Sequence, residues 1–211
     1  MADAGVAGMD ALIDRARSLR PVIRERAPAC EAARRVPEET MADLRAAGLF
    51  RVLQPARYGG LEGGLDDFIG LVELVAQGCG STGWVYSVAA IHQWQIAMYH
   101  PDAQEEVWGD DDEALASSSY VPSGTAEPVS GGWRLSGFWN FCSGCDNTRW
   151  MIVGGRFKGN ETPGAHAFFL IPRADYRIED NWYVLGLAGT GSKNIVVEDA
   201  FVPAHRVLTV E

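Results

Sequence analysis

Hydrophobic residues recur at helical spacing through the first hundred residues of the chain. Pro37 and the two glutamates after it mark the start of one helix, and Gly48 marks its end. The segment 81–99 is apolar almost all round, so we expect that helix to be buried. The predicted helices are 9–29, 37–48, 65–76, 81–99 and 101–108.

The hydrophobic period changes from about 3.6 to about 2 near residue 114, which predicts strands from there on. Pro, Gly and Ser punctuate this half, as in Pro122-Ser123-Gly124, and short connections favour antiparallel pairing. We therefore predict an α+β fold, with a helical domain at 1–112 and an antiparallel β-barrel or sandwich domain at 113–211. The predicted strands are 115–119, 133–141, 150–157, 166–171, 176–183 and 194–201.

The formal net charge of −10 argues against nucleic-acid binding, because neutralising phosphates needs a basic face. The acidic run 110–113 is most simply a solvent-exposed connection, with docking of a basic partner as the alternative. No stretch has the roughly 18–20 uninterrupted apolar residues of a membrane span, and the N-terminus has no secretory signal pattern. We expect a cytoplasmic protein that does not enter a membrane.

Four cysteines do not make a disulfide framework in a chain of 211 residues. Cys142 and Cys145 form a C-x-x-C pair, but strand patterns flank it on both sides, whereas a thioredoxin-like pair opens a helix. No second C-x-x-C and no closely spaced histidine pair accompanies it. We therefore predict no metal site.

The end of the strand 133–141 carries the most informative chemistry. Trp139, Phe141 and Ser143 are two residues apart, so an extended backbone places them on one face. Together they offer an aromatic wall and a hydroxyl, which an isoalloxazine ring needs. On residue types alone, two ordinary core aromatics followed by a turn are the simpler interpretation.

A glycine-rich segment about forty residues later supplies a second candidate. Thr190 and Ser192 flank Gly191, and their hydroxyls and backbone amides can hold a flavin phosphate or ribityl chain. A strand pattern follows the segment, so it is not the dinucleotide-binding fingerprint, which opens a helix. The alternative is an ordinary β-hairpin turn.

In order along the chain, several motifs resemble the acyl-CoA dehydrogenase superfamily, and the closer match is its flavin-dependent monooxygenase branch. The recurrent pattern Trp-x-Phe-x-Ser-Gly-x-Asp of that branch is matched at 139–146. The other motifs are Tyr58-Gly59-Gly60, Gly80-Ser81-Thr82-Gly83-Trp84, Gly132-Trp133, Gly186 to Ser192 and Val202-Pro203.

The resemblance implies the oxygenase component of a two-component enzyme similar to 4-hydroxyphenylacetate 3-hydroxylase. Such a component takes reduced flavin, FMN or FAD, from a separate reductase and hydroxylates an aromatic or polyketide-like molecule through a C4a-hydroperoxyflavin. It implies that Ser143 lies by flavin N5, with Trp139 and Phe141 as the wall and Thr190 and Ser192 at the flavin.

The same resemblance bears on two residues outside these motifs. Ser118 ends the first strand, where relatives place the flavin pyrimidine and the substrate, although it is equally a polar strand edge. A histidine in the helix that holds His92 reaches the substrate hydroxyl in phenol-hydroxylating relatives. By residue type alone, His92 is a core histidine satisfied by a neighbouring carbonyl.

Members of the family are roughly twice as long as this chain and end in a C-terminal helical bundle. This chain stops at Glu211, before such a bundle, so we expect a second chain to supply it, within an oligomer. The alternatives are an engineered fragment of a longer protein and a degenerate relative. Two other functions stay open. One is an acyl-CoA dehydrogenase-like oxidoreductase, with a faint echo of that family's loop at Thr125-Ala126-Glu127-Pro128. The other is a non-catalytic subunit that pairs with a homologous flavoenzyme.

Overall fold

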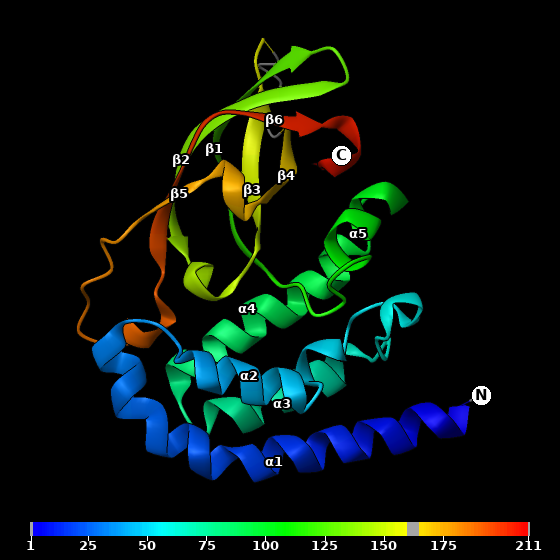
Figure 1. Cartoon of the computed structure of the whole chain (residues 1–211), viewed down its shortest axis with the longest axis vertical. Helices are drawn as coiled ribbons and strands as arrows, with labels where there is room; N and C mark the ends of the chain where they lie inside the picture. The colour runs from blue at the N-terminus through cyan, green and yellow to red at the C-terminus, as the bar shows by residue number, and fades with distance from the viewer. Residues whose placement is uncertain (1, 160–164, 211) are drawn as a thin grey trace.

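The computed structural model describes residues 2–159 and 165–210 (Figure 1). The helices gather at one end of the molecule, with the long α1 along the base and the sheet above them. The ends of α3 and α5 match the prediction, while α1 starts earlier than predicted. The helices are α1 Ala2–Ala33, α2 Glu38–Ala46, α3 Leu65–Ala76, α4 Gly80–Ile96 and α5 Pro101–Trp108.

The strands form one seven-stranded sheet in the order β5-β6-β2-β1-β3-β4-β7. The prediction of an antiparallel domain is corrected at one pair, because β1 and β3 run parallel. After the β1–β2 hairpin, the chain passes through the turn η3 (Cys145–Asn147) and returns along the other edge of β1. The strands are β1 Ala116–Val129, β2 Gly132–Cys142, β3 Trp150–Phe157, β4 His166–Pro172, β5 Arg177–Glu179, β6 Lys193–Pro203 and β7 Val207–Val210.

The segment 122–124, predicted as a connection, lies inside β1. The pairing of β1 with β3 shifts register between Ser119 and Gly124, so the strand continues through an irregularity. A side chain at Gly124 would lie 2.4 Å from Trp139 Cζ2. Gly124 therefore marks a close approach between strand and indole, not a break in the strand. Sequence patterning also missed β7 and made β5 too long.

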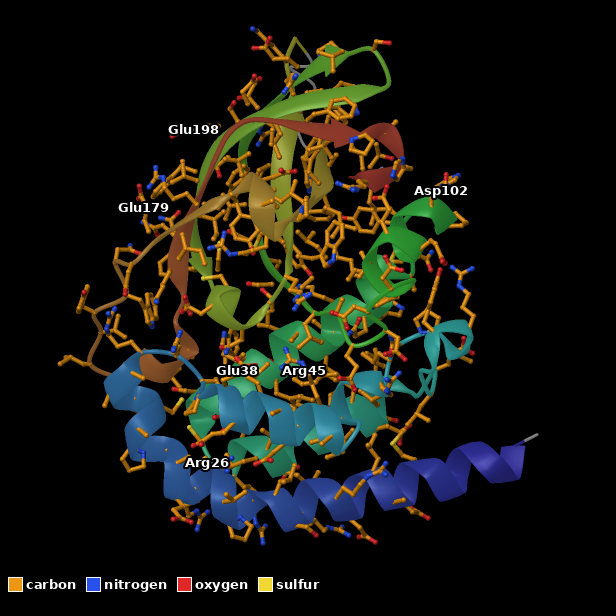
Figure 2. The ribbon with its side chains drawn as sticks, viewed as in Figure 1. Arg26, Glu38, Arg45, Asp102, Glu179 and Glu198 are labelled. Carbon is orange, nitrogen blue, oxygen red and sulfur yellow. The ribbon has the colours of Figure 1, made fainter. Side chains whose placement is uncertain are left out.

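A shared hydrophobic cluster joins the helices to the sheet. Tyr99 and Trp108 pack in it with Ile152 and Leu170. Polar contacts add to the junction near η3, where Asn147 Nδ2 donates to Val36 O at 3.1 Å and Arg45 reaches Asn147 O at 3.4 Å. Figure 2 shows Arg45 on α2 on the side of the helix that faces this turn.

Helix α4 is not buried all round, which corrects the prediction for the segment 81–99. Trp84, Trp94 and Met98 are each about half exposed, and Ile91 is partly exposed between them. These four residues recur at helical spacing and form one face, which we call the α4 stripe. Across the described residues, none of the helices combines the length and apolar character needed to cross a membrane.

We predict that Trp139→Phe lowers the free energy of unfolding by about 1–3 kcal/mol, because it removes a donor to buried carbonyls. Trp139 Nε1 donates to Gly154 O at 2.8 Å and to Val121 O at 3.1 Å. Urea unfolding followed by circular dichroism measures the change. The control Phe141→Leu alters an exposed side chain and should stay within about 0.5 kcal/mol of the parent. Equal stability of the two variants would contradict the conclusion that the hydrogen bonds from Trp139 Nε1 stabilise the fold.

Candidate functional site

The end of β2 does not keep the simple alternation that the sequence predicts. Its pairing with β6 shifts register between Trp139 and Cys142, and Phe141 has a φ of 60°. Trp139 is 0% exposed and Phe141 is 65% exposed, so their side chains lie in opposite environments. The prediction that Trp139 and Phe141 share one face is wrong, because the irregularity breaks the period of two. Trp139 lies in the sheet core and does not line an open site.

Three buried hydroxyls form a hydrogen-bonded chain beside this strand end. Ser143 Oγ lies 2.7 Å from Ser192 Oγ, and Ser192 Oγ lies 2.7 Å from Thr190 Oγ1. Thr190 Oγ1 donates to Leu187 O at 2.9 Å, and Trp84 Nε1 donates to Ser143 Oγ at 2.9 Å. We call Ser143, Ser192 and Thr190 the hydroxyl chain. The structure thus brings together two segments that the sequence singled out separately.

The direction of every proton in the hydroxyl chain follows from its two ends. Leu187 O can only accept, so the Thr190 hydroxyl donates its single proton to that carbonyl and must accept a hydrogen bond from Ser192. Ser192 then accepts from Ser143, and Ser143 accepts from the indole N–H of Trp84. A hydroxyl oxygen has two lone pairs, so Ser143 Oγ keeps one further acceptor position. The site is therefore set to accept a hydrogen bond from a ligand N–H.

Trp84 is the exposed aromatic residue of this site. Its side chain is 53% exposed, although its N–H is engaged with Ser143. Phe141 lies near the other end, with its ring centroid 5.9 Å from that of Trp182, whose Nε1 donates to Leu187 O at 3.2 Å. Open aromatic surface and a buried polar centre therefore meet here. Sequence reasoning assigned Trp84 to the core, because its helix reads as apolar on every side.

The turn that carries Thr190 and Ser192 is fixed from α1. The carboxylate of Glu31 accepts from Ala188 N at 2.9 Å, from Gly189 N at 3.2 Å and from the Ser81 hydroxyl. A second anchor is the ion pair between Lys193 Nζ and Asp146 at 2.8 Å, both largely buried. Sequence reasoning missed Glu31, since nothing local marks an acid at the end of a helix as the partner of a distant turn.

The serine run at the start of β1 splits between two faces. Ser117 Oγ donates to Ser143 O at 2.7 Å and Ser119 Oγ donates to Asn140 O at 3.0 Å, so both brace the end of β2. Ser118 points the other way, toward the Tyr120 hydroxyl. The structure therefore places Ser118 beside Tyr120 and not in the hydroxyl chain.

His92 is buried on α4, with 2% of its surface exposed. Its Nδ1 lies 2.9 Å from Ala116 O, so this nitrogen carries the proton, and its Nε2 lies 3.0 Å from the Tyr120 hydroxyl. The Tyr120 oxygen also lies 2.5 Å from Gln95 Oε1, so its one proton serves one of these acceptors at a time. Burial lowers the pKa of His92 to about 4, which keeps the imidazole neutral. The half-exposed Tyr120 side chain lies between His92 and the solvent.

A hollow of about 430 Å³ opens on the far side of Tyr120. Its walls are almost wholly apolar, and the Tyr120 and Phe168 rings pack within it at a centroid distance of 4.9 Å. Polar groups come from Tyr120, Gln95 and Thr209. The other walls are Ile91, Trp94, Met98 and Leu208, so the hollow continues the α4 stripe.

Comparisons with known proteins agree with this architecture. Residues 10–110 match the family described as acyl-CoA dehydrogenase, N-terminal domain. The chain is 46% identical over 192 residues to the flavin-dependent monooxygenase, oxygenase subunit HsaA, of Rhodococcus jostii, covering 91% of this chain and 50% of that protein. It is 43% identical over 205 residues to the FADH(2)-dependent resorcinol hydroxylase, oxygenase component, of a Rhizobium species, covering 94% and 49%.

Among solved structures, 3-HSA hydroxylase from Rhodococcus sp. RHA1 matches with a TM-score of 0.91 at 45% identity, covering 94% of this chain and 51% of that one. These matches confirm the resemblance to the acyl-CoA dehydrogenase superfamily that its motifs predicted. Within it, the chain is similar to the oxygenase components of flavin-dependent monooxygenases. The chain spans about half the length of the curated relatives it matches.

We predict that His92 makes stability depend on pH between about 6.5 and 4. An unfolded histidine titrates near pH 6.5, and His92 in the folded chain has a pKa of about 4. Its contribution is complete above pH 6.5 and is lost as the pH falls toward 4, by about 3 kcal/mol in total.

Urea unfolding of the parent and His92→Gln at several pH values measures this contribution. Glutamine can bond Ala116 O but does not titrate, so the parent should lose about 3 kcal/mol more than the variant over this range. Identical slopes for the two proteins would show that His92 is not held neutral.

Proposed function

We propose that this chain forms the flavin-binding part of the oxygenase component of a two-component monooxygenase. The component takes reduced FMN or FAD from a separate reductase and hydroxylates an aromatic or polyketide-like small molecule. Bound reduced flavin supplies the electrons that activate O2 for transfer of one oxygen atom. The printed names of the relatives, oxygenase subunit and oxygenase component, support this proposal.

The observation that carries the proposal is the hydroxyl chain with its open acceptor at Ser143. Reduced flavin carries an N–H at N5, so it offers the donor that this acceptor lacks. The half-exposed indole of Trp84 next to Ser143 and the exposed ring of Phe141 provide apolar surface for an isoalloxazine. The residues present therefore fit a reduced flavin.

In this proposal the predicted residues act in other ways than the resemblance implies. Ser143 and Trp84 are the groups that contact flavin, and Trp84 replaces Trp139 as the aromatic wall. Thr190 and Ser192 are buried at 2% and 5% exposure, so in this proposal they are positioning residues that orient the Ser143 proton. Because that proton points to Ser192, Ser143 acts first as an acceptor.

We assign the aromatic substrate to the hollow beside Tyr120. The hollow is apolar with a hydroxyl at its wall, which suits a phenol or a similar planar molecule. Trp84 beside Ser143 and Trp94 in the hollow share one face of α4 and are ten helix residues apart, roughly 15 Å, so this hollow lies within reach of a ligand held at Ser143. Tyr120, and not His92, would meet the substrate hydroxyl. His92 would act as a positioning residue that accepts from Tyr120.

No contact in the described chain favours the acyl-CoA dehydrogenase-like alternative. The segment 125–128, which echoes the loop of that branch, is paired strand here, with Thr125 opposite Ser136. Glu127 in this segment forms an ion pair with Lys158 at 2.6 Å. Titration with reduced flavin separates the flavin-free subunit alternative from the proposal.

We predict that Ser143→Ala weakens binding of reduced flavin by about three- to tenfold, the value of one hydrogen bond. Anaerobic titration with reduced FMN and reduced FAD, followed by tryptophan fluorescence, measures affinity for the chain with any polypeptide that copurifies with it. Ser123→Ala is the control, because that hydroxyl donates only to Phe138 O on the surface. Unchanged affinity in Ser143→Ala would contradict the role of Ser143. A parent that binds no reduced flavin would overturn the proposed function.

We further propose that helices outside these 211 residues, in a second chain, cover the α4 stripe. The stripe is apolar, adjoins both the hollow and the hydroxyl chain, and leaves the flavin and substrate open to water on that side. Covering it would exclude water from the reaction.

Native mass spectrometry of the protein from its own host tests this cover. We expect a complex that contains a second, helix-rich chain and one flavin per pair when reduced flavin is added. Trp94→Glu, which places a charge in the stripe, should dissociate that complex, whereas Asp102→Ala on the exposed start of α5 should not. A single chain that binds flavin without any other polypeptide would contradict the second chain and leave the flavin site intact.

A further inference from the structure

Two cysteines outside the C-x-x-C motif meet where α1 and α4 approach each other. Cys30 lies near the C-terminal end of α1, and Cys79 is the residue directly before α4. Their sulfur atoms lie within 4.8 Å of each other and of a carboxylate oxygen of Glu31. Cys30 is 1% exposed and Cys79 is 6% exposed, and both thiols are free. The pair is far apart in sequence and was not predicted.

The surroundings of the two thiols make them chemically unequal. Cys79 sits at the N-terminal end of a helix of 17 residues, where the macrodipole favours an anion. A hydrogen bond from Cys30, with help from Thr82 and the nearby amides, lowers the pKa of Cys79 against the opposing effect of burial. The same hydrogen bond, followed by burial, raises the pKa of Cys30. Of the two thiols, Cys79 therefore ionises more readily than Cys30.

The C-x-x-C pair lacks this arrangement. Cys142 and Cys145 are both 0% exposed in the sheet core. Burial raises the pKa of Cys145 to about 12 and that of Cys142 further. Both remain thiols at neutral pH and are poor nucleophiles. The sequence motif therefore marks the less reactive of the two pairs.

The space around the first pair fits a covalent bond better than a metal ion. A Cβ added to Gly189 would lie 2.4 Å from Cys30 Sγ, so the turn already packs against this sulfur. The carboxylate of Glu31 is occupied by the amides of Ala188 and Gly189 and by the Ser81 hydroxyl. A metal needs room for bonds of about 2.3 Å to each sulfur. A disulfide of about 2.05 Å needs no added volume.

We propose that Cys30 and Cys79 form a redox-active dithiol that a peroxide oxidises to a disulfide, and that this bond alters the turn 187–191. Cys79 thiolate attacks the O–O bond of hydrogen peroxide, which gives a sulfenic acid and releases hydroxide. Cys30 sulfur then attacks Cys79 sulfur, the S–S bond forms, the S–O bond breaks, and a second hydroxide leaves and takes the Cys30 proton. The first hydroxide takes up the proton that Cys79 lost when it ionised, so two thiols lose two electrons and one peroxide becomes two waters.

The effect on the turn follows from the contacts of Cys30. Its Sγ lies 3.7 Å from Gly189 O, next to Thr190 of the hydroxyl chain, and its single proton serves either this carbonyl or the Cys79 sulfur. A disulfide removes this donor and draws the sulfur toward Cys79. Because the hydroxyl chain positions Ser143, oxidation should weaken the binding of reduced flavin by about tenfold, a typical coupling between two sites. This last step rests on the proposed function, whereas the formation of the disulfide does not.

The test exposes the folded full chain, with any partner that copurifies, to a small excess of hydrogen peroxide. Peptide mass spectrometry under non-reducing conditions should find one cross-linked pair that holds Cys30 and Cys79, lighter by two hydrogen atoms and reversed by dithiothreitol. Cys142 and Cys145 should remain free. A small neutral alkylating agent should label Cys79 at least about tenfold faster than Cys142, as thiolate character requires.

Two variants show whether the cross-link joins Cys30 and Cys79 specifically. Cys30→Ser, which keeps a hydrogen-bond donor beside Cys79, should stop the cross-link and leave Cys79 as a sulfenic acid that a dimedone probe captures, while Cys145→Ala should keep the cross-link. No cross-link in the parent, equal labelling of Cys79 and Cys142, or a zinc ion that stays bound to the pair would overturn the proposal. A cross-link with unchanged flavin affinity would refute only the effect on the turn. A reduced parent that binds no flavin would refute the proposed function instead.

Discussion

The structure depends on one helix, α4, which is held by two neighbours and leaves its third side exposed. On one side it packs into the helical core, where Tyr86 donates to Leu49 O at 3.0 Å. On a second side it holds the first strand, because His92 and Gln93 bond the carbonyls of Ala116 and Ala114. These two attachments fix its rotation, so its third side, the α4 stripe, stays open. The position of Trp84 beside the end of β2 is a consequence of that rotation.

The candidate site is built where segments far apart in sequence meet at the start of α4. The end of β2 supplies Ser143, the turn before β6 supplies Thr190 and Ser192, and α1 supplies Glu31 to hold that turn. Hydrogen bonds of fixed direction connect these parts, so Ser143 has a defined role as an acceptor. Cys30 and Cys79 lie at the same junction. Their oxidation can therefore alter the site although neither sulfur contacts a ligand.

The sequence predicted most helices, because a period of 3.6 and a proline at the first position define α5 and similar signals define α3. It did not predict the parallel β1–β3 pair, which depends on the edge to which the chain returns after η3. Family motifs singled out Ser143, Thr190 and Ser192 as candidates, and in the structure their hydroxyls are hydrogen-bonded to one another. Trp139 was expected at an open site and is buried, whereas Trp84 was expected in the core and is half exposed. A register shift in β2 buries the first, and the rotation of α4 exposes the second. Tertiary packing decides both, so the local sequence carries no signal for them.

The most direct test of this account is a crystal structure of the protein, with any partner chain, grown anaerobically with reduced flavin. The account predicts a flavin whose N5 lies within hydrogen-bond distance of Ser143 Oγ and whose ring contacts Trp84, while Trp139 stays buried. A flavin bound elsewhere on the chain would contradict the account. So would a flavin whose only atom near Ser143 Oγ is a hydrogen-bond acceptor and not N5.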